Sequence, residues 1–171
     1  MLNPDADIYI TGCAKKYNIN EFKEFKIRDL DKPDEFDDYG FNACKDSCFI
    51  TPGSGAGIVK IQEGCSKSCS YCITRKLRGP SRSVSYDTIC SQIKNILNKG
   101  YRCIQLVGTE LCYYWSDGMN LPQLMKRILD DFPEIKSMTF EALDPGSTCI
   151  EDVIDVVKNT NKIENSMCLA V

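Results

Sequence analysis

The sequence contains no histidine, and this absence argues against several kinds of active site. A catalytic zinc site usually mixes histidine with cysteine or carboxylate ligands, and a serine or cysteine nucleophile is usually activated by a histidine base. Both classes are therefore strongly disfavoured. Metal ligation by thiolates alone remains open, and the chain has 11 cysteines.

Long apolar runs are also missing. No stretch approaches the roughly 18 consecutive apolar residues of a membrane-spanning helix, and the N-terminus lacks the basic and then apolar pattern of a signal peptide. The 171 residues are 43% hydrophobic, which is enough for a core of one-domain size. The sequence therefore predicts a soluble globular protein in the cytoplasm, with no membrane partner.

Cysteine is abundant for a chain that shows no secretion signal. This abundance favours metal or redox chemistry in a reducing compartment over a disulfide framework. Several cysteines fall mainly on predicted strand or helix faces, where a free cysteine acts as a small hydrophobic residue. They are Cys90, Cys103, Cys112, Cys149 and Cys168.

Positive charge is concentrated in one segment. The net charge is -3, yet residues 58–82 contain 6 Lys/Arg and 1 Asp/Glu. The same segment contains a cysteine cluster, so a positive patch there would favour thiolates and could meet an anionic ligand or a nucleic acid. A solvated charged loop explains the charge alone equally well.

From about residue 58, short apolar runs alternate with amphipathic stretches, which is typical of β-α units that build a parallel sheet. Strands are predicted over residues 58–62, 102–107, 137–141 and 167–171. Helices are predicted over residues 85–99, from an Asn120 cap through Leu129, and from a capping box at Thr148 and Glu151 through Val157. The predicted fold class is α/β.

The first 50 residues follow another pattern. A short strand over residues 7–11 leads into Gly12 and Cys13, and acidic, weakly periodic sequence follows. Residues 51–57, Thr-Pro-Gly-Ser-Gly-Ala-Gly, are typical of a linker or a turn cluster. We therefore expect a domain boundary between residues 50 and 51.

The strongest chemical signal is a C-x₃-C-x₂-C motif directly after the predicted strand at residues 58–62. Cys65, Cys69 and Cys72 place three thiolates on one tight loop, where they can hold three irons of a [4Fe–4S] cluster and leave the fourth iron open. An open iron can chelate a small ligand and pass it an electron. Half of a zinc knuckle is the alternative, and its fourth ligand would have to come from Cys44 or Cys48.

The motif resembles the signature of the radical S-adenosylmethionine enzymes, C-x₃-C-x-φ-C, in which φ is aromatic and is here Tyr71. Further stretches look like the methylthiotransferases of this group, and most like the branch that modifies threonylcarbamoyladenosine beside the anticodon of tRNA. These stretches are residues 61–73, 78–83, 100–101, 106–111 and 143–145. The resemblance covers roughly residues 5–15 and 58–171.

The resemblance implies a partial (β/α) TIM-type barrel of about four β/α units in residues 51–171. The C-terminal part of an α/β methylthiotransferase domain would precede it in residues 1–50. The position of the cysteine motif after the first strand of the barrel fits this fold, because the active sites of such barrels lie at the carboxyl ends of the strands.

The resemblance also implies a set of cofactors and site residues. The three motif cysteines would hold a [4Fe–4S] cluster that binds and reductively cleaves S-adenosyl-L-methionine. Contacts to this cofactor would come from Tyr71, Gly108, Thr109 and Glu110. A reductant protein such as flavodoxin or ferredoxin would be a partner.

The segment around Cys13 resembles the last of three cysteines that bind an auxiliary cluster in the family's N-terminal domain. This cluster is implicated in sulfur donation. No cysteine precedes Cys13. We therefore expect a chain that is truncated at both ends and does not retain the second [4Fe–4S] cluster, with Cys44 or Cys48 as alternative ligands.

The implied activity is transfer of a methylthio group to a modified adenosine next to the anticodon of tRNA. A ribosomal-protein methylthiotransferase and an inactive iron–sulfur-binding remnant are the alternatives. Binding to tRNA is expected to be weak, without the family's C-terminal RNA-binding domain. It would use basic side chains on phosphates and aromatic stacking on a base. The candidates are Lys67, Arg75, Lys76, Arg78, Arg82 and the aromatic residues 113–115.

Overall fold

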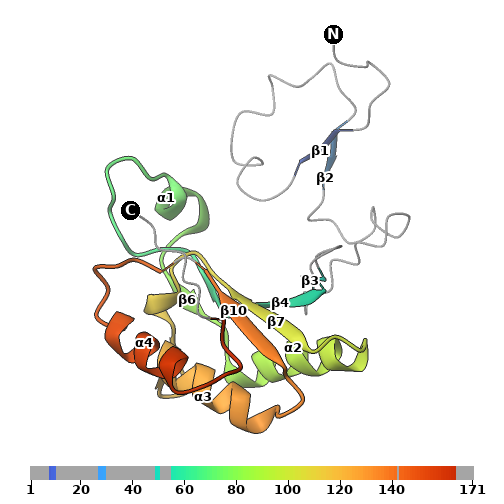
Figure 1. Ribbon diagram of the computed structural model, residues 1–171. Helices are drawn as coiled ribbons and strands as arrows, with labels where there is room; N and C mark the ends of the chain where they lie inside the picture. The colour runs from blue at the N-terminus through green and yellow to red at the C-terminus, as the bar shows by residue number, and fades with distance from the viewer. Residues whose placement is uncertain (1–7, 11–26, 30–48, 51–54, 142, 165–171) are drawn as a thin grey trace. The chain divides into compact units, whose positions relative to one another are not determined.

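The computed structural model of the protein describes residues 8–10, 27–29, 49–50, 55–141 and 143–164 (Figure 1). The chain divides into two compact units, Met1–Lys45 and Asp46–Val171. In the first unit, strands β1 (Ile8–Ile10) and β2 (Ile27–Asp29) pair in parallel. The identities predicted for the two domains, and their boundary after residue 50, stay predictions.

Over its described residues, the second unit is built on a four-stranded sheet of order β10-β7-β4-β3. Strands β4 (Ala56–Lys60), β7 (Cys103–Val107) and β10 (Ser137–Phe140) are parallel, and β3 (Phe49–Ile50) is antiparallel to β4. Each parallel strand lies beside the next one in sequence, as in a (β/α) barrel. The predicted α/β fold with a parallel sheet is confirmed, and over the described residues this sheet is open.

One long helix follows each parallel strand, and the three helices cover one face of the sheet (Figure 1). They are α2 (Tyr86–Asn98), α3 (Leu121–Asp131) and α4 (Ile150–Lys158). Their apolar faces and the inward side chains of the strands form one buried core. In the described part of the chain, no helix is long and apolar enough to cross a membrane.

The first residues of helices α3 and α4 can be compared with the N-caps that the sequence predicts. The Asn120 side chain accepts the Gln123 N–H, and the Gln123 side chain accepts the Asn120 N–H, so this cap is confirmed as a full capping box. The capping box predicted at Thr148 is wrong. Helix α4 starts after Cys149, which makes no side-chain cap hydrogen bond.

Strand β4 begins inside the segment that the sequence predicts as a linker. Ala56 and Gly57 pair with Cys103 and Ile104 of β7. A Cβ atom on residue 57 would lie only 2.5 Å from Cγ2 of Ile96 in α2. The glycine therefore allows a close approach between helix and sheet, and residues 56–57 belong to the folded core instead of a linker.

The strand predicted over residues 58–62 is in fact two strands, because the chain changes partners after Lys60. The Gln92 side chain on α2 bonds both the N–H and the C=O of Lys60, at 2.9 and 3.1 Å. Strand β5 (Gln62–Glu63) then pairs antiparallel with β6 (Arg82–Ser83). This second pairing closes the neck of the loop that contains the cysteine motif.

The aromatic run at residues 113–115 is divided between core and surface. A 3₁₀ helix, η5 (Leu111–Tyr113), precedes a hairpin of β8 (Trp115–Ser116) and β9 (Met119–Asn120). Tyr114 is buried, and its hydroxyl donates to the Val84 carbonyl at 3.1 Å. The run therefore cannot stack on a base as a unit, and only Tyr113 and Trp115 expose their rings.

Cys112 and Cys149 form a disulfide, which corrects the prediction that both are free apolar residues. Cys112 lies in η5 and Cys149 caps α4, and their Cα atoms are 5.9 Å apart, within disulfide range. The sequence separation of 37 residues hides this proximity. Cys90 and Cys103 are free thiols, and the strand predicted at residues 167–171 lies outside the described residues.

We expect Gly57→Ala to lower the free energy of unfolding by about 1–3 kcal/mol, the usual cost of overpacking a core. The added methyl group would force Ile96 out of its place against the sheet. Urea denaturation measures the change. Gly146→Ala is the control, because its Cβ would meet Asp144 only at an ordinary 3.5 Å. Equal stability of the two variants would contradict the close approach.

Tyr114 should make the fold sensitive to alkali. Burial, with the nearby charge of Asp117 as a second cause, raises the pKa of Tyr114 to about 12. The folded state then holds this proton more tightly than the unfolded state, whose tyrosine pKa is about 10. Stability from this group is complete below about pH 10 and is lost as pH rises through about 12.

The variant Tyr114→Phe should therefore flatten the fall in unfolding free energy between about pH 10 and pH 12. At pH 8 it should be less stable by about 1 kcal/mol, because the bond to Val84 is lost. Tyr113→Phe removes a hydroxyl from a half-exposed ring on the same segment and should match the parent chain at pH 8. An unchanged slope in Tyr114→Phe would contradict the role of the buried hydroxyl.

Candidate functional site

The cysteine motif lies on the loop of residues 64–81, which leaves β5 and returns in β6. The neck of this loop is tight. The Cys65 N–H donates to the Gly79 carbonyl at 3.1 Å, and Gly64 adopts a left-handed φ of 75°. A Cβ atom on residue 64 would collide with the Pro80 carbonyl, so glycine is required at this position.

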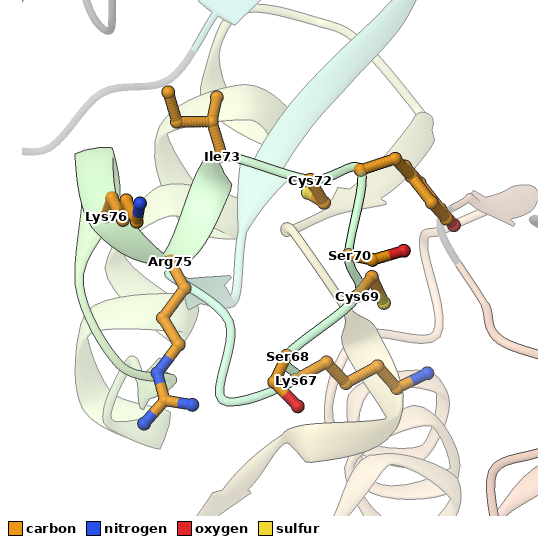
Figure 2. A pocket seen from close by; sticks show the side chains of 9 residues that line it. Lys67, Ser68, Cys69, Ser70, Cys72, Ile73, Arg75 and Lys76 are labelled. Atoms are coloured by element: carbon orange, nitrogen blue, oxygen red, sulfur yellow. The ribbon is translucent and has the colours of Figure 1, made fainter.

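The three motif cysteines are free thiols, and two of them, Cys69 and Cys72, line an open cavity. Cys69 and Cys72 are exposed, and Cys65 is partly buried. A cavity of about 430 Å³ is lined by the loop and by α1 (Thr74–Arg78), with Cys69 and Cys72 in its wall (Figure 2). Among the described residues, no three potential ligands gather tightly enough for a single metal ion.

This arrangement fits an iron–sulfur cluster better than a lone ion. A cubane cluster is bound through separate irons, so its thiolate ligands do not converge on one atom. Three free thiols on one loop, beside an open cavity, supply the donors that such a cluster needs. Cys13, Cys44 and Cys48, the predicted ligands of an auxiliary cluster or of a zinc ion, lie outside the described residues.

The surroundings of Cys72 favour the thiolate form of its side chain. Its Sγ lies 3.2 Å from Oγ1 of Thr74, at the start of α1. The neutral thiol donates to this hydroxyl; once the sulfur is charged, it accepts from the hydroxyl and from the backbone N–H of Thr74, which lowers the pKa of Cys72. A thiolate is the form that binds iron.

Lys67 connects the cysteine loop to two strand ends. Its Nζ lies 3.2 Å from Oε2 of Glu110, which follows β7, and it also pairs with Asp144, which follows β10. Parallel strands end at the same edge of the sheet, so the three groups meet there. Two carboxylates neutralise the ammonium group of Lys67 in this structure, and its contact with RNA phosphates stays a prediction.

Residues 108–110, predicted to contact the cofactor, lie at the same edge. The Glu110 side chain is almost fully buried, and its Oε1 accepts the Cys112 N–H at 3.3 Å. Oγ1 of Thr109 is buried and has no hydrogen-bond partner within the described structure. A buried hydroxyl without a partner costs about 1–3 kcal/mol, so a hydrogen bond to this atom would be stabilising.

Tyr71, the other predicted cofactor contact, has 87% of its surface exposed. It lies in the wall of the cavity between Cys69 and Cys72. The structure therefore places Tyr71 beside Cys69 and Cys72, and Glu110 beside Lys67. Contact of these residues with a cofactor stays a prediction.

Sequence reasoning missed Gln62 and the pairing of Lys67 with Asp144. Gln62 is a buried polar residue that joins the loop neck to residues 109–110. A polar residue at the boundary between an apolar strand and a cysteine motif was the available signal. The partners could not be read from the sequence, because they lie 47 and 48 residues further along the chain.

The chain matches the family description "Radical SAM superfamily" over residues 59–166. This range contains the cysteine loop and the strand ends that carry Glu110 and Asp144. The match therefore covers the site as well as most of the described sheet.

Individual relatives are methylthiotransferases by name. The chain is 27% identical to the threonylcarbamoyladenosine tRNA methylthiotransferase MtaB of Rickettsia prowazekii (strain Madrid E), over 83% of this chain and 39% of the relative. It is 31% identical to the ribosomal protein uS12 methylthiotransferase RimO of Thermodesulfovibrio yellowstonii, over 77% of this chain and 33% of the relative. The chain thus spans well under half the length of either protein.

A shorter match has higher identity. The MtaB protein of Aquifex aeolicus (strain VF5) is 39% identical over 42% of this chain and 18% of its own length. Three free motif cysteines, their place at the carboxyl edge of a parallel sheet, and the family match all agree. The chain therefore belongs to the radical SAM superfamily, and the relatives that it matches there are methylthiotransferases.

Proposed function

We propose that the chain is the cofactor-cleaving part of a radical S-adenosylmethionine methylthiotransferase that modifies tRNA. The observation that carries the proposal is the meeting of a free three-cysteine loop with the buried carboxylate of Glu110 at one edge of the sheet. The chain spans only 39% of the length of the MtaB relative, so the methylthiotransferase activity of the whole protein is part of what we propose.

Cys65, Cys69 and Cys72 would hold the [4Fe–4S] cluster. When bound, this cluster supplies the electron for reductive cleavage of S-adenosylmethionine. The chain's own part is to present thiolates, which Thr74 favours at Cys72, and to hold them on a loop with a closed neck. A reductant protein such as flavodoxin or ferredoxin belongs to the same proposal.

The charge around Glu110 supports binding of the amino group of S-adenosylmethionine. Lys67, Glu110 and Asp144 together carry one more negative than positive charge. Glu110 is buried, so its carboxylate gains more from a second cation than an exposed carboxylate would. The free hydroxyl of Thr109 adds a hydrogen-bonding group next to it. Tyr71 would flank the cofactor from the cysteine loop.

Exposed cations beside the cavity support an RNA substrate. Arg75 and Lys76 lie on α1, which buries none of its residues, and both side chains line the cavity (Figure 2). Trp115 exposes 66% of its surface and offers a ring for stacking on a base. The ribosomal protein is the second candidate substrate, favoured by the 31% identity to a RimO protein.

The cysteine loop can be tested by assembling the cluster. After anaerobic reconstitution with iron and sulfide, we expect the chain to bind about four irons. With dithionite and S-adenosylmethionine, it should release 5′-deoxyadenosine. The triple variant Cys65→Ala, Cys69→Ala, Cys72→Ala should do neither, because the thiolate ligands are gone.

The matched control is Cys90→Ala with Cys103→Ala, which removes two free thiols outside the loop. This control should load iron like the parent chain. Equal iron uptake and 5′-deoxyadenosine release by the triple variant would refute the assignment of the loop as the cluster site.

RNA binding can be tested by its salt dependence. We expect the chain to bind tRNA weakly, with an affinity that falls as salt rises, because phosphate contacts release counterions. Replacing Arg75 and Lys76 by Ala should reduce the slope of log K against log salt by about 1 to 2. Fluorescence anisotropy with labelled tRNA measures the slope.

The control is the double variant Lys94→Ala, Lys99→Ala, which removes one cation from α2 and one directly after it. This variant should keep the parent slope of log K against log salt. An unchanged slope in the Arg75 and Lys76 variant would remove α1 from the RNA interface. Binding to a uS12 fragment with no measurable binding to tRNA would favour the ribosomal-protein alternative.

A further inference from the structure

The side chain of Gln62 is buried between the two segments that form the site. It has 1% of its surface exposed. Its Nε2 donates to the Gly64 carbonyl at 2.6 Å and to Oγ of Ser81 at 2.9 Å, on the two sides of the loop neck. Its Oε1 accepts the N–H groups of Thr109 and Glu110 at 2.7 and 3.0 Å.

These contacts use the full capacity of the side chain. A carboxamide has two N–H donors and an oxygen with two lone pairs, and Gln62 engages all four, with the Glu63 carbonyl as a third acceptor 3.2 Å from Nε2. The orientation of the amide is fixed, because a flip would point N–H groups at the N–H groups of Thr109 and Glu110. Ionised glutamate at position 62 would keep the acceptor and lose both donors, and its second oxygen would face the Gly64 carbonyl.

Gly108 supports the same arrangement. A Cβ atom on residue 108 would lie 2.9 Å from Oε1 of Gln62, 3.0 Å from its Cβ, and 2.6 Å from Cδ2 of Leu111. The absence of a side chain at position 108 is thus what lets the carboxamide reach the two N–H groups beyond it. Glycine at the strand end and glutamine at the loop neck form one packed unit.

We propose that Gln62 is a positioning residue that sets the cysteine loop and the Glu110 carboxylate in one fixed relation. This inference deepens the proposed function and rests on it. Cys65 follows Gly64, whose carbonyl Gln62 holds, and the Glu110 side chain branches from a residue whose N–H Gln62 holds. Both segments have to contact the same S-adenosylmethionine, so a shift of one against the other weakens that contact.

If Gln62 only stabilised the fold, replacing any similar buried glutamine should have the same effect. Gln92 is such a residue and serves as the comparison for Gln62. Gln92 is 4% exposed and also bonds backbone groups through both ends of its carboxamide. Its partner is Lys60, in strand β4, so it touches neither the loop neck nor residues 108–110. Gln62→Met and Gln92→Met each replace a buried carboxamide by an apolar side chain of similar length.

The experiment measures three quantities on the full 171-residue chain and on both variants. Amide hydrogen exchange by NMR on the iron-free chain reports the N–H groups of Thr109 and Glu110. Iron and sulfide analysis reports cluster loading. Isothermal titration of the reconstituted, anaerobic chain reports the Kd for S-adenosylmethionine.

For Gln62→Met, we expect faster exchange at the two amides, cluster loading like the parent chain, and a Kd raised about 10- to 100-fold, the usual cost of losing a group that orients a ligand shell. Gln92→Met should keep the parent Kd and the parent exchange at residues 109 and 110. Gln62→Glu should restore slow exchange at both amides, because the acceptor remains, while its Kd stays raised.

An unchanged Kd in Gln62→Met, or an equal rise in Gln92→Met, would overturn the inference. If Gln62→Met does not fold, Gln62→Glu decides: a Kd like that of the parent chain overturns the inference, and a raised Kd with protected amides supports it. Failure of the parent chain to load a cluster would instead reject the proposed function. The exchange rates of the iron-free chain would then show by themselves whether Gln62 fixes residues 109–110.

Discussion

The site depends on how the cysteine loop is fixed to the carboxyl edge of the parallel sheet. A loop of mostly exposed residues has little apolar surface to hold it in place, so polar contacts under it carry this task. The carboxamide of Gln62 ties its neck to residues 109–110, and the ammonium of Lys67 reaches Glu110 and Asp144. Buried polar contacts of this kind are directional, so they fix geometry that apolar packing leaves loose.

The basic segment divides its charges between two tasks. Lys67, at one end of the cavity wall, is compensated by two carboxylates, whereas Arg75 and Lys76 line the same cavity from α1 as exposed cations. An exposed cation can bind an anion at little desolvation cost. A partly buried cation needs groups of opposite charge to compensate for lost hydration. Within the same basic segment, Lys67 therefore helps to hold the site together, and Arg75 and Lys76 face solvent.

The cysteines also differ by position. The motif thiols stay free on an exposed loop, Cys90 packs against the core, and Cys112 is joined to Cys149 between η5 and the start of α4. The disulfide lies two residues after Glu110, so it anchors the segment that follows this carboxylate. Cysteine count and spacing alone do not distinguish these environments, since each is set by neighbours that are distant in sequence.

By itself, the sequence determined the α/β class, the three long helices, the strands near residues 102–107 and 137–141 and the position of the cysteine motif, because hydrophobic periodicity and motif spacing are local. Tertiary structure decided the rest. Gly57 became part of a strand because Ile96 packs over it, Lys67 became an internal ion pair, and Gln62 became a link between two segments. These outcomes depend on contacts between residues that lie about 40 to 80 positions apart, and no local pattern encodes which distant groups a folded sheet brings together.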